Sequence, residues 1–287
     1  ELIAQVGLSD EALWQSSNEP AAWGRQIVNR LFDYDNHYSR LFFYLGLARK
    51  GLTTDLLHYL EPGWSETDCR QRLAEANQLS IVKTRAKYHA TEEALFLHDV
   101  LYEFFDAYGP AAAQLTPWYE RLAGYYRRQQ VKVSRKHDQA SWEQTTLSLL
   151  YYELQQSPHR AFTDSYIHWA EMAIKGHETG FDMQLREELL RFFHRPANQQ
   201  QAAEQGINLG VIEQDSAVRW AKRYLARGRH QKTINVAETI LALGPFSFLV
   251  ENTRVYQEAV PIEQQQKAKE IFNQSAPLFW GRLLATY

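Results

Sequence analysis

The chain is short of cysteine, glycine and proline, and it has no long apolar run. Its one cysteine, Cys69, cannot form an internal disulfide, so we expect a reducing compartment. The 14 glycines and 9 prolines are few for an all-β protein, which needs many tight turns. Because no apolar run approaches the ~18–20 residues of a membrane span, we expect no membrane partner.

The chain also has no large excess of positive or negative charge. The formal net charge is −3 and the pI is near 6.4, which argues against binding of polyanions over the whole surface. What the chain has is apolar and aromatic: 45% apolar residues, with 8 Trp, 16 Tyr and 14 Phe. Such a composition supports a sizeable core in which aromatic rings fill the gaps between helices.

The N-terminal residues suggest a piece of a longer protein. Glu1 stands where an initiator Met would be, and the basic and apolar regions of a signal peptide are absent. We therefore expect a cytoplasmic protein that has further chemistry upstream of Glu1.

Short helices and then a hairpin are expected in the first 110 residues. After helical residues 1–37, the expected helices are 36–50, 52–60 and 66–78. The first begins at Asn36 or Ser39 and ends at Gly51, as a C′ glycine would end it. The third opens with a capping box formed by Ser65 and Asp68.

Alternating, β-branched residues 79–84 and the apolar run 94–97 predict two strands joined by a loop over 85–93. Three helices followed by a hairpin is the order of a winged-helix domain, which we place at residues 38–110. The fold class is therefore mainly all-α, with one small β-hairpin.

His98 and Asp99 stand where the second strand meets the next helix. The helix has an expected apolar face of Leu97, Val100, Leu101, Phe104 and Tyr108. A histidine at a helix N-terminus suits an anion such as a phosphate, because free N–H groups and the helix dipole point there. The alternative is that His98 caps the helix or sits in a satisfied interface.

Helices alone are expected from Trp118 onward, after a short connection over 111–117. Apolar stripes recur between polar joins, which is typical of stacked helical hairpins. In residues 217–245, Tyr224, Gly228, Ala237 and Pro245 stand at the spacing of a tetratricopeptide repeat. We predict a helical array of degenerate repeats over residues 111–287.

The stretch from about Tyr38 to Tyr108 resembles the winged-helix domain of STAND-type signalling NTPases, the NB-ARC and NACHT-like family. The residues that carry the resemblance are 40–45, 73–82 and the triplet Leu97-His98-Asp99. The triplet matches that family's Met-His-Asp motif, with Leu97 in place of Met. The resemblance implies that His98 contacts the β-phosphate of bound ADP and that Asp99 orients the loop.

The same resemblance implies a regulatory and sensor portion of a signal-transduction NTPase. Residues 1–37 would link to an upstream nucleotide-binding domain that holds ADP or ATP, and the array would sense a protein or small-molecule trigger. The chain has no G-x-x-x-x-G-K-[ST] sequence, so we expect no enzyme activity from it, although the intact parent would be an ATPase. We also expect the chain alone to hold no cofactor.

Two other functions stay open. One is a transcriptional regulator whose winged helix reads DNA, although Arg70 and Arg72 of the candidate recognition helix stand among Glu66, Asp68 and Glu75, which disfavours DNA. The other is a scaffold that binds a partner protein in the array.

The basic stretch 121–136 has no acidic residue. Its candidate partner-binding residues are Arg127, Arg128, Lys132 and Arg135. They predict a patch for a polyanion or an acidic partner, and the alternative is a solvated helix face. No histidine pair has the spacing of a zinc site with a third ligand, so no metal is expected. Asp68 beside Cys69 is expected to raise the pKa of the thiol, which argues against a nucleophile.

Overall fold

The computed structural model describes residues 20–35, 39–86, 93–205 and the positions 207, 212, 215, 219, 220, 223, 224, 227–229 and 232. The chain divides into two compact units, residues 1–149 and 150–287. Over the described residues the protein is mainly helical, as predicted, with a two-stranded antiparallel sheet.

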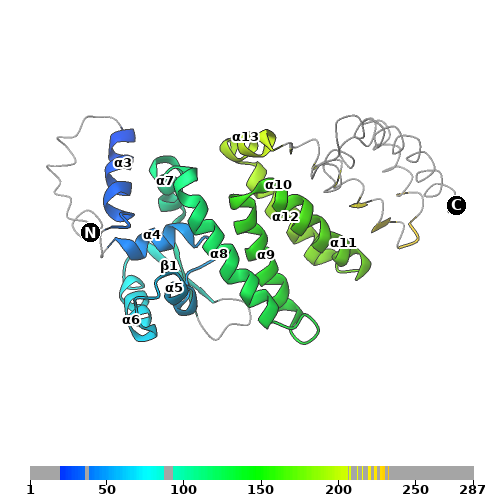
Figure 1. Ribbon diagram of the computed structural model, residues 1–287, viewed down its shortest axis with the longest axis horizontal. Helices are drawn as coiled ribbons and strands as arrows, with labels where there is room; N and C mark the ends of the chain where they lie inside the picture. The colour runs from blue at the N-terminus through cyan, green and yellow to red at the C-terminus, as the bar shows by residue number, and fades with distance from the viewer. Residues whose placement is uncertain are drawn as a thin grey trace. The chain divides into compact units, whose positions relative to one another are not determined.

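In the described part of the first unit, short helices come first, the hairpin follows, and longer helices come last (Figure 1). Its elements are α3 (Pro20–Leu31), α4 (Arg40–Leu47), α5 (Thr54–Leu60), α6 (Glu66–Ala76), β1 (Val82–Ala86), β2 (Glu93–Leu97), α7 (Asp99–Tyr108), α8 (Ala112–Lys132) and the start of α9 (Gln139–Gln156).

The predicted hairpin is confirmed, although its strands are shifted. β1 and β2 pair from Val82↔Leu97 to Ala86↔Glu93, so β1 starts three residues later than expected. Leu79 is not part of the strand because its N–H donates to the carbonyl of Ala76 (3.0 Å), which extends the turn after α6. Both strands extend into residues 85–93, which were expected to be a loop, because β1 ends at Ala86 and β2 begins at Glu93.

A third segment joins the hairpin. Leu52, between α4 and α5, forms an isolated bridge with Leu95 of β2, with N–O distances of 2.9 and 3.0 Å. α4 therefore ends at Leu47 rather than at Lys50, because the chain must turn earlier to bring Leu52 to β2. Gly51 makes this turn with a φ of +93°. It is not the C′ glycine that was expected, because α4 ends at Leu47 with Ala48 as its C-cap.

The buried face of α7 differs from the predicted one. Leu101 and Phe105 are buried, whereas Val100 is 57% exposed. The ring of Phe105 packs edge-on against Phe32 with centroids 4.9 Å apart, and it also lies against Gly46, where a Cβ would come within 2.7 Å. This contact sets the rotation of the helix and turns Val100 outward.

An aromatic cluster forms the centre of the first unit. It contains Tyr34, Phe43, Tyr44 and Trp118, with centroid distances between 5.0 and 6.1 Å. Trp118 reaches it because α8 starts at Ala112 and continues through Pro117, so the expected connection over 111–117 is wrong. Pro117 is the sixth residue of α8, so the helix lacks the hydrogen bond that an N–H at this position would donate to the carbonyl of Ala113.

The secondary-structure elements described in the second unit are all helices. It contains the end of α9, then α10 (Pro158–Arg160), the π-helical η1 (Ala161–Tyr166), α11 (Ile167–Lys175), α12 (Thr179–Phe193) and α13 (Pro196–Glu204). The apolar stripe predicted for α12 is buried as expected: Leu185, Leu189, Phe192 and Phe193. η1 was not predicted, and it places the ring of Phe162 in a stack with Tyr166, with centroids 5.6 Å apart.

A buried ionic cluster lies in the second unit. Arg219 donates two hydrogen bonds to the carboxylate of Asp215, at 2.7 and 2.8 Å, and one to Glu171 at 3.3 Å. Its guanidinium also lies 5.2 Å from the ring centroid of Tyr166. These contacts satisfy a charge that burial would otherwise make costly.

Some predictions lie outside the described residues. They include the helical start of residues 1–19 and the repeat positions Ala237 and Pro245. No helix of the described residues combines the length and the apolar character needed to cross a bilayer.

Candidate functional site

His98 lies between β2 and α7, and the backbone around it is fixed by hydrogen bonds. Its N–H donates to the carbonyl of Ile81 (3.0 Å), and its own carbonyl accepts from the N–H of Leu101 (2.9 Å). The preceding N–H, of Leu97, donates to the hydroxyl of Tyr102 (3.1 Å). His98 is therefore held at the N-cap position of α7.

The side chain of His98 is exposed and forms no capping hydrogen bond, although the residue occupies the N-cap position and its carbonyl accepts from Leu101. Asp99, the first residue of α7, is exposed too, and its carboxylate lies 3.4 Å from the ammonium of Lys83 on β1. The site thus presents a histidine, a lysine, a carboxylate and a helix N-terminus at one end of the hairpin.

Arg49 holds α7 against the end of α4. Its guanidinium donates to the carbonyl of Gly46 (2.8 Å) and to the carboxylate of Asp106 (2.5 Å). It also lies 4.1 Å from the ring centroid of Tyr102, whose hydroxyl accepts from Leu97. Through Tyr102 this arginine helps to position the backbone that carries His98.

The two arginines of α6 are already engaged. Arg70 pairs with Glu66 at 2.7 Å, and the guanidinium of Arg72 lies 4.1 Å from the ring centroid of Trp64. Both arginines therefore already have partners within α6 or beside it. In a DNA-binding winged-helix domain, this is the helix that would enter the groove.

The predicted capping box at the start of α6 is confirmed. The N–H of Asp68 donates to the hydroxyl of Ser65 (3.1 Å), and the N–H of Ser65 donates back to the Asp68 carboxylate (3.0 Å). The Ser65 hydroxyl and N–H that donate to this carboxylate hold the pKa of Asp68 below its usual range.

The basic stretch does not form one patch. Arg128 and Lys132 of α8 line a cleft of about 690 Å³, together with Arg121. Arg127 is exposed and does not line it, and the guanidinium of Arg135, beyond the end of α8, lies 5.0 Å from the ring centroid of Trp142. Of the four candidate residues, only Arg128 and Lys132 are brought together at the cleft.

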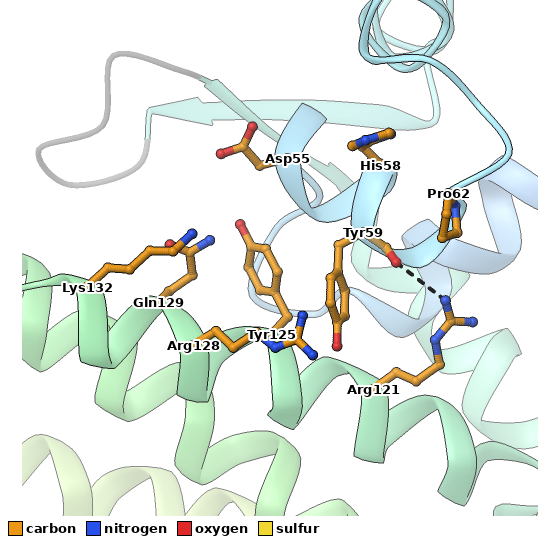
Figure 2. A pocket seen from close by; sticks show the side chains of 9 residues that line it. All are labelled: Asp55, His58, Tyr59, Pro62, Arg121, Tyr125, Arg128, Gln129 and Lys132. Carbon is orange, nitrogen blue, oxygen red and sulfur yellow. Dashed lines mark hydrogen bonds between the residues drawn. The ribbon is translucent and has the colours of Figure 1, made fainter.

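Helix α5 forms the other wall of this cleft (Figure 2). Tyr59 points from α5 toward α8 and Tyr125 points back from α8, with ring centroids 5.4 Å apart. Asp55 and His58 add polar groups from α5. Sequence reasoning missed this wall, since nothing in residues 54–60 indicates which helix they will face.

Potential metal ligands and the one cysteine can be placed in the part of the chain that the structure describes. Those residues contain no group of three or more His, Cys, Asp or Glu side chains that could hold a metal ion. Cys69 is buried inside α6, as expected, and burial is the main reason that the pKa of its thiol is raised, with the charge of Asp68 adding to it.

Comparisons with known protein families, with curated proteins and with solved structures found no match to this chain.

Proposed function

We propose that this chain is the regulatory and sensor portion of a STAND-type NTPase, in which His98 contacts the phosphate of ADP held by an upstream domain. The observation that carries the proposal is the side chain of His98, which is exposed at the start of α7 and forms no capping hydrogen bond. Such a side chain is available to a ligand that a second domain brings to it.

The element order around His98 supports the same proposal. In a winged helix, a short strand between the first two helices pairs with the hairpin that follows the third. The bridge between Leu52 and Leu95 occupies that place, between α4 and α5, and β2 leads directly to His98. The helices that follow α7 are compatible with a tetratricopeptide-like sensor arm.

The electrostatics at this site fit a phosphate. The first N–H groups of α7 and the helix dipole attract an anion. Lys83 offsets the carboxylate of Asp99, which would otherwise repel a phosphate. ADP bound between the upstream domain and His98 would favour a closed resting state, and a trigger on the arm would favour the open one.

The test uses the full-length parent protein. We expect the purified protein to release stoichiometric ADP when it is denatured, as identified by chromatography. His98→Ala should weaken ADP retention by about tenfold or more, because a charge-assisted contact is lost, and should raise basal activity.

His168→Ala is the matched control, because His168 is an exposed histidine on α11 of the other unit. It should leave ADP retention and basal activity unchanged. A folded, monodisperse parent that releases no nucleotide would contradict the proposal, and so would equal ADP retention in the His98→Ala protein and the unmodified parent.

A further inference from the structure

The cleft between α5 and α8 offers two cations to a ligand. Arg128 and Lys132 are both exposed, and neither forms an ion pair with an acidic side chain of the described residues. They lie one helical turn apart on α8, so their Cβ atoms are about 6 Å from each other. Their charged ends can therefore converge on one anionic group.

The third basic residue of the cleft has a structural role. The guanidinium of Arg121 donates to the carbonyls of Leu60 (2.8 Å) and Tyr59 (3.4 Å), which end α5. Figure 2 shows its bond to Tyr59 as a dashed line. Its hydrogen-bonding capacity is thus partly used within the fold, whereas the guanidinium of Arg128 lies 5.2 Å from the ring centroid of Tyr59.

The pairing of an arginine with a lysine suits a phosphate. The guanidinium presents two parallel N–H donors to phosphate oxygens, and the ammonium adds a mobile point charge. The cleft volume of about 690 Å³ lies within the range of small-molecule sites and leaves room for more than one phosphate.

The rest of the cleft indicates what the phosphate is attached to. Asp55 lies on the α5 side, across from Gln129 and Lys132 (Figure 2). A carboxylate repels a bare anion, but it accepts hydrogen bonds from the hydroxyl groups of a sugar. The amide of Gln129 both donates and accepts, and the rings of Tyr59 and Tyr125 form an apolar wall.

We propose that this cleft binds a phosphorylated sugar, either free or as part of a nucleotide. The phosphate contacts Arg128 and Lys132, and the sugar hydroxyls donate to Asp55. The proposal does not depend on His98, because His98 belongs to another part of the first unit and does not line this cleft.

The first test is calorimetric titration of the 287-residue chain with ribose 5-phosphate, AMP and inorganic phosphate. We expect ribose 5-phosphate and AMP to bind, and inorganic phosphate to bind more weakly. Arg128→Gln/Lys132→Gln should weaken binding of both organic phosphates by about tenfold or more.

Arg127→Gln/Lys136→Gln is the matched control. It removes the same charge at exposed positions that do not line the cleft, so affinity should stay within about twofold. Equal losses in the two double variants, with melting curves that show both to be folded, would overturn the proposal. Failure of both organic phosphates to bind at millimolar concentration would do the same.

Asp55→Asn separates sugar recognition from simple charge attraction. If Asp55 accepts sugar hydroxyls, the substitution weakens binding of ribose 5-phosphate while it strengthens binding of inorganic phosphate. Tighter binding of all three compounds would mean that Asp55 only repels anions, and the proposed sugar contact would be wrong. Binding of AMP without ribose 5-phosphate would assign the cleft to nucleotides, and equal binding of the two would assign it to the sugar phosphate they share.

Discussion

At the scale of single residues, Gly51 determines how α4 is joined to the hairpin. Its φ of +93° is strained for any other L-residue, and a Cβ there would lie 2.7 Å from the Cβ of Ala94 and from the ring of Phe96. Gly51→Ala should lower the free energy of unfolding by about 2–3 kcal/mol, because strain and a steric clash add together. Urea denaturation followed by tryptophan fluorescence measures this loss.

Gly63→Ala is the control for that substitution. Gly63 lies in a turn with no positive φ, and the nearest atom to its added Cβ is a Glu61 carboxylate oxygen at 3.6 Å. The expected change is below about 0.5 kcal/mol. Equal losses at the two glycines would show that the turn at Gly51 is not under the steric constraint described.

Residues whose role is local could be predicted from the sequence. The Ser65–Asp68 box is set by neighbours within a few positions, whereas the turn at Gly51 lies beyond the end of α4 and faces Ala94 and Phe96 of β2. One wall of the cleft was also readable, since Arg121, Tyr125, Arg128 and Lys132 recur at helical spacing. The α5 wall was not, because Asp55 and Tyr59 reach the cleft only through tertiary packing.

At the scale of elements, Arg121 provides the hydrogen bonds that join α8 to the end of α5, beside the ring contact of Tyr59 with Tyr125. Arg121 donates to two carbonyls at the end of α5, and its guanidinium lies 5.0 Å from the ring centroid of Trp118. Arg121→Met should lower the free energy of unfolding by about 2 kcal/mol, because carbonyls lose a charged donor in a partly buried place. Thermal and urea denaturation both report it.

Lys132→Met serves as the comparison, because Lys132 is exposed on the same helix and lines the same cleft. Without ligand it should change stability by less than about 0.5 kcal/mol. A loss as large as that of Arg121→Met would mean that charge on α8, rather than the bond to α5, stabilises the unit.

Elements were predicted better than their rotation and their long-range partners. The helices and the hairpin follow from periodicity and from capping residues. The apolar face predicted for α7 included Val100, which is exposed, and left out Phe105, which is buried against Phe32. The bridge of Leu52 to Leu95 and the π-helical turn at 161–166 also depend on tertiary packing. The local sequence pattern does not predict either feature.

At the scale of the whole molecule, buried tyrosines should make the free energy of unfolding fall at alkaline pH. Tyr44, Tyr126 and Tyr166 are almost fully buried, and burial is the main reason that their pKa values are raised well above the ordinary value of about 10. The charge of Glu61 adds to the shift at Tyr44, and that of Asp215 at Tyr166.

The sign follows from proton linkage. Above about pH 10 the unfolded chain releases these phenolic protons while the folded chain keeps them, so the free energy of unfolding falls as pH rises. Each such phenol should contribute a slope of about 1.4 kcal/mol per pH unit, and its contribution is fully present below pH 10. We therefore expect cooperative alkaline unfolding in which phenolate absorbance and loss of helical circular dichroism rise together.

Tyr126→Phe tests the assignment, because it removes one phenol that titrates while keeping the buried ring. Urea denaturation between pH 9 and about 11 gives the free energy of unfolding as a function of pH. Its slope should correspond to one proton fewer released on unfolding than in the unmodified chain. Tyr119→Phe, at a position that is not buried, should leave the slope unchanged. If tyrosines ionised in the folded chain without loss of helix, or if both variants behaved alike, the buried phenols would not be the groups that limit stability at high pH.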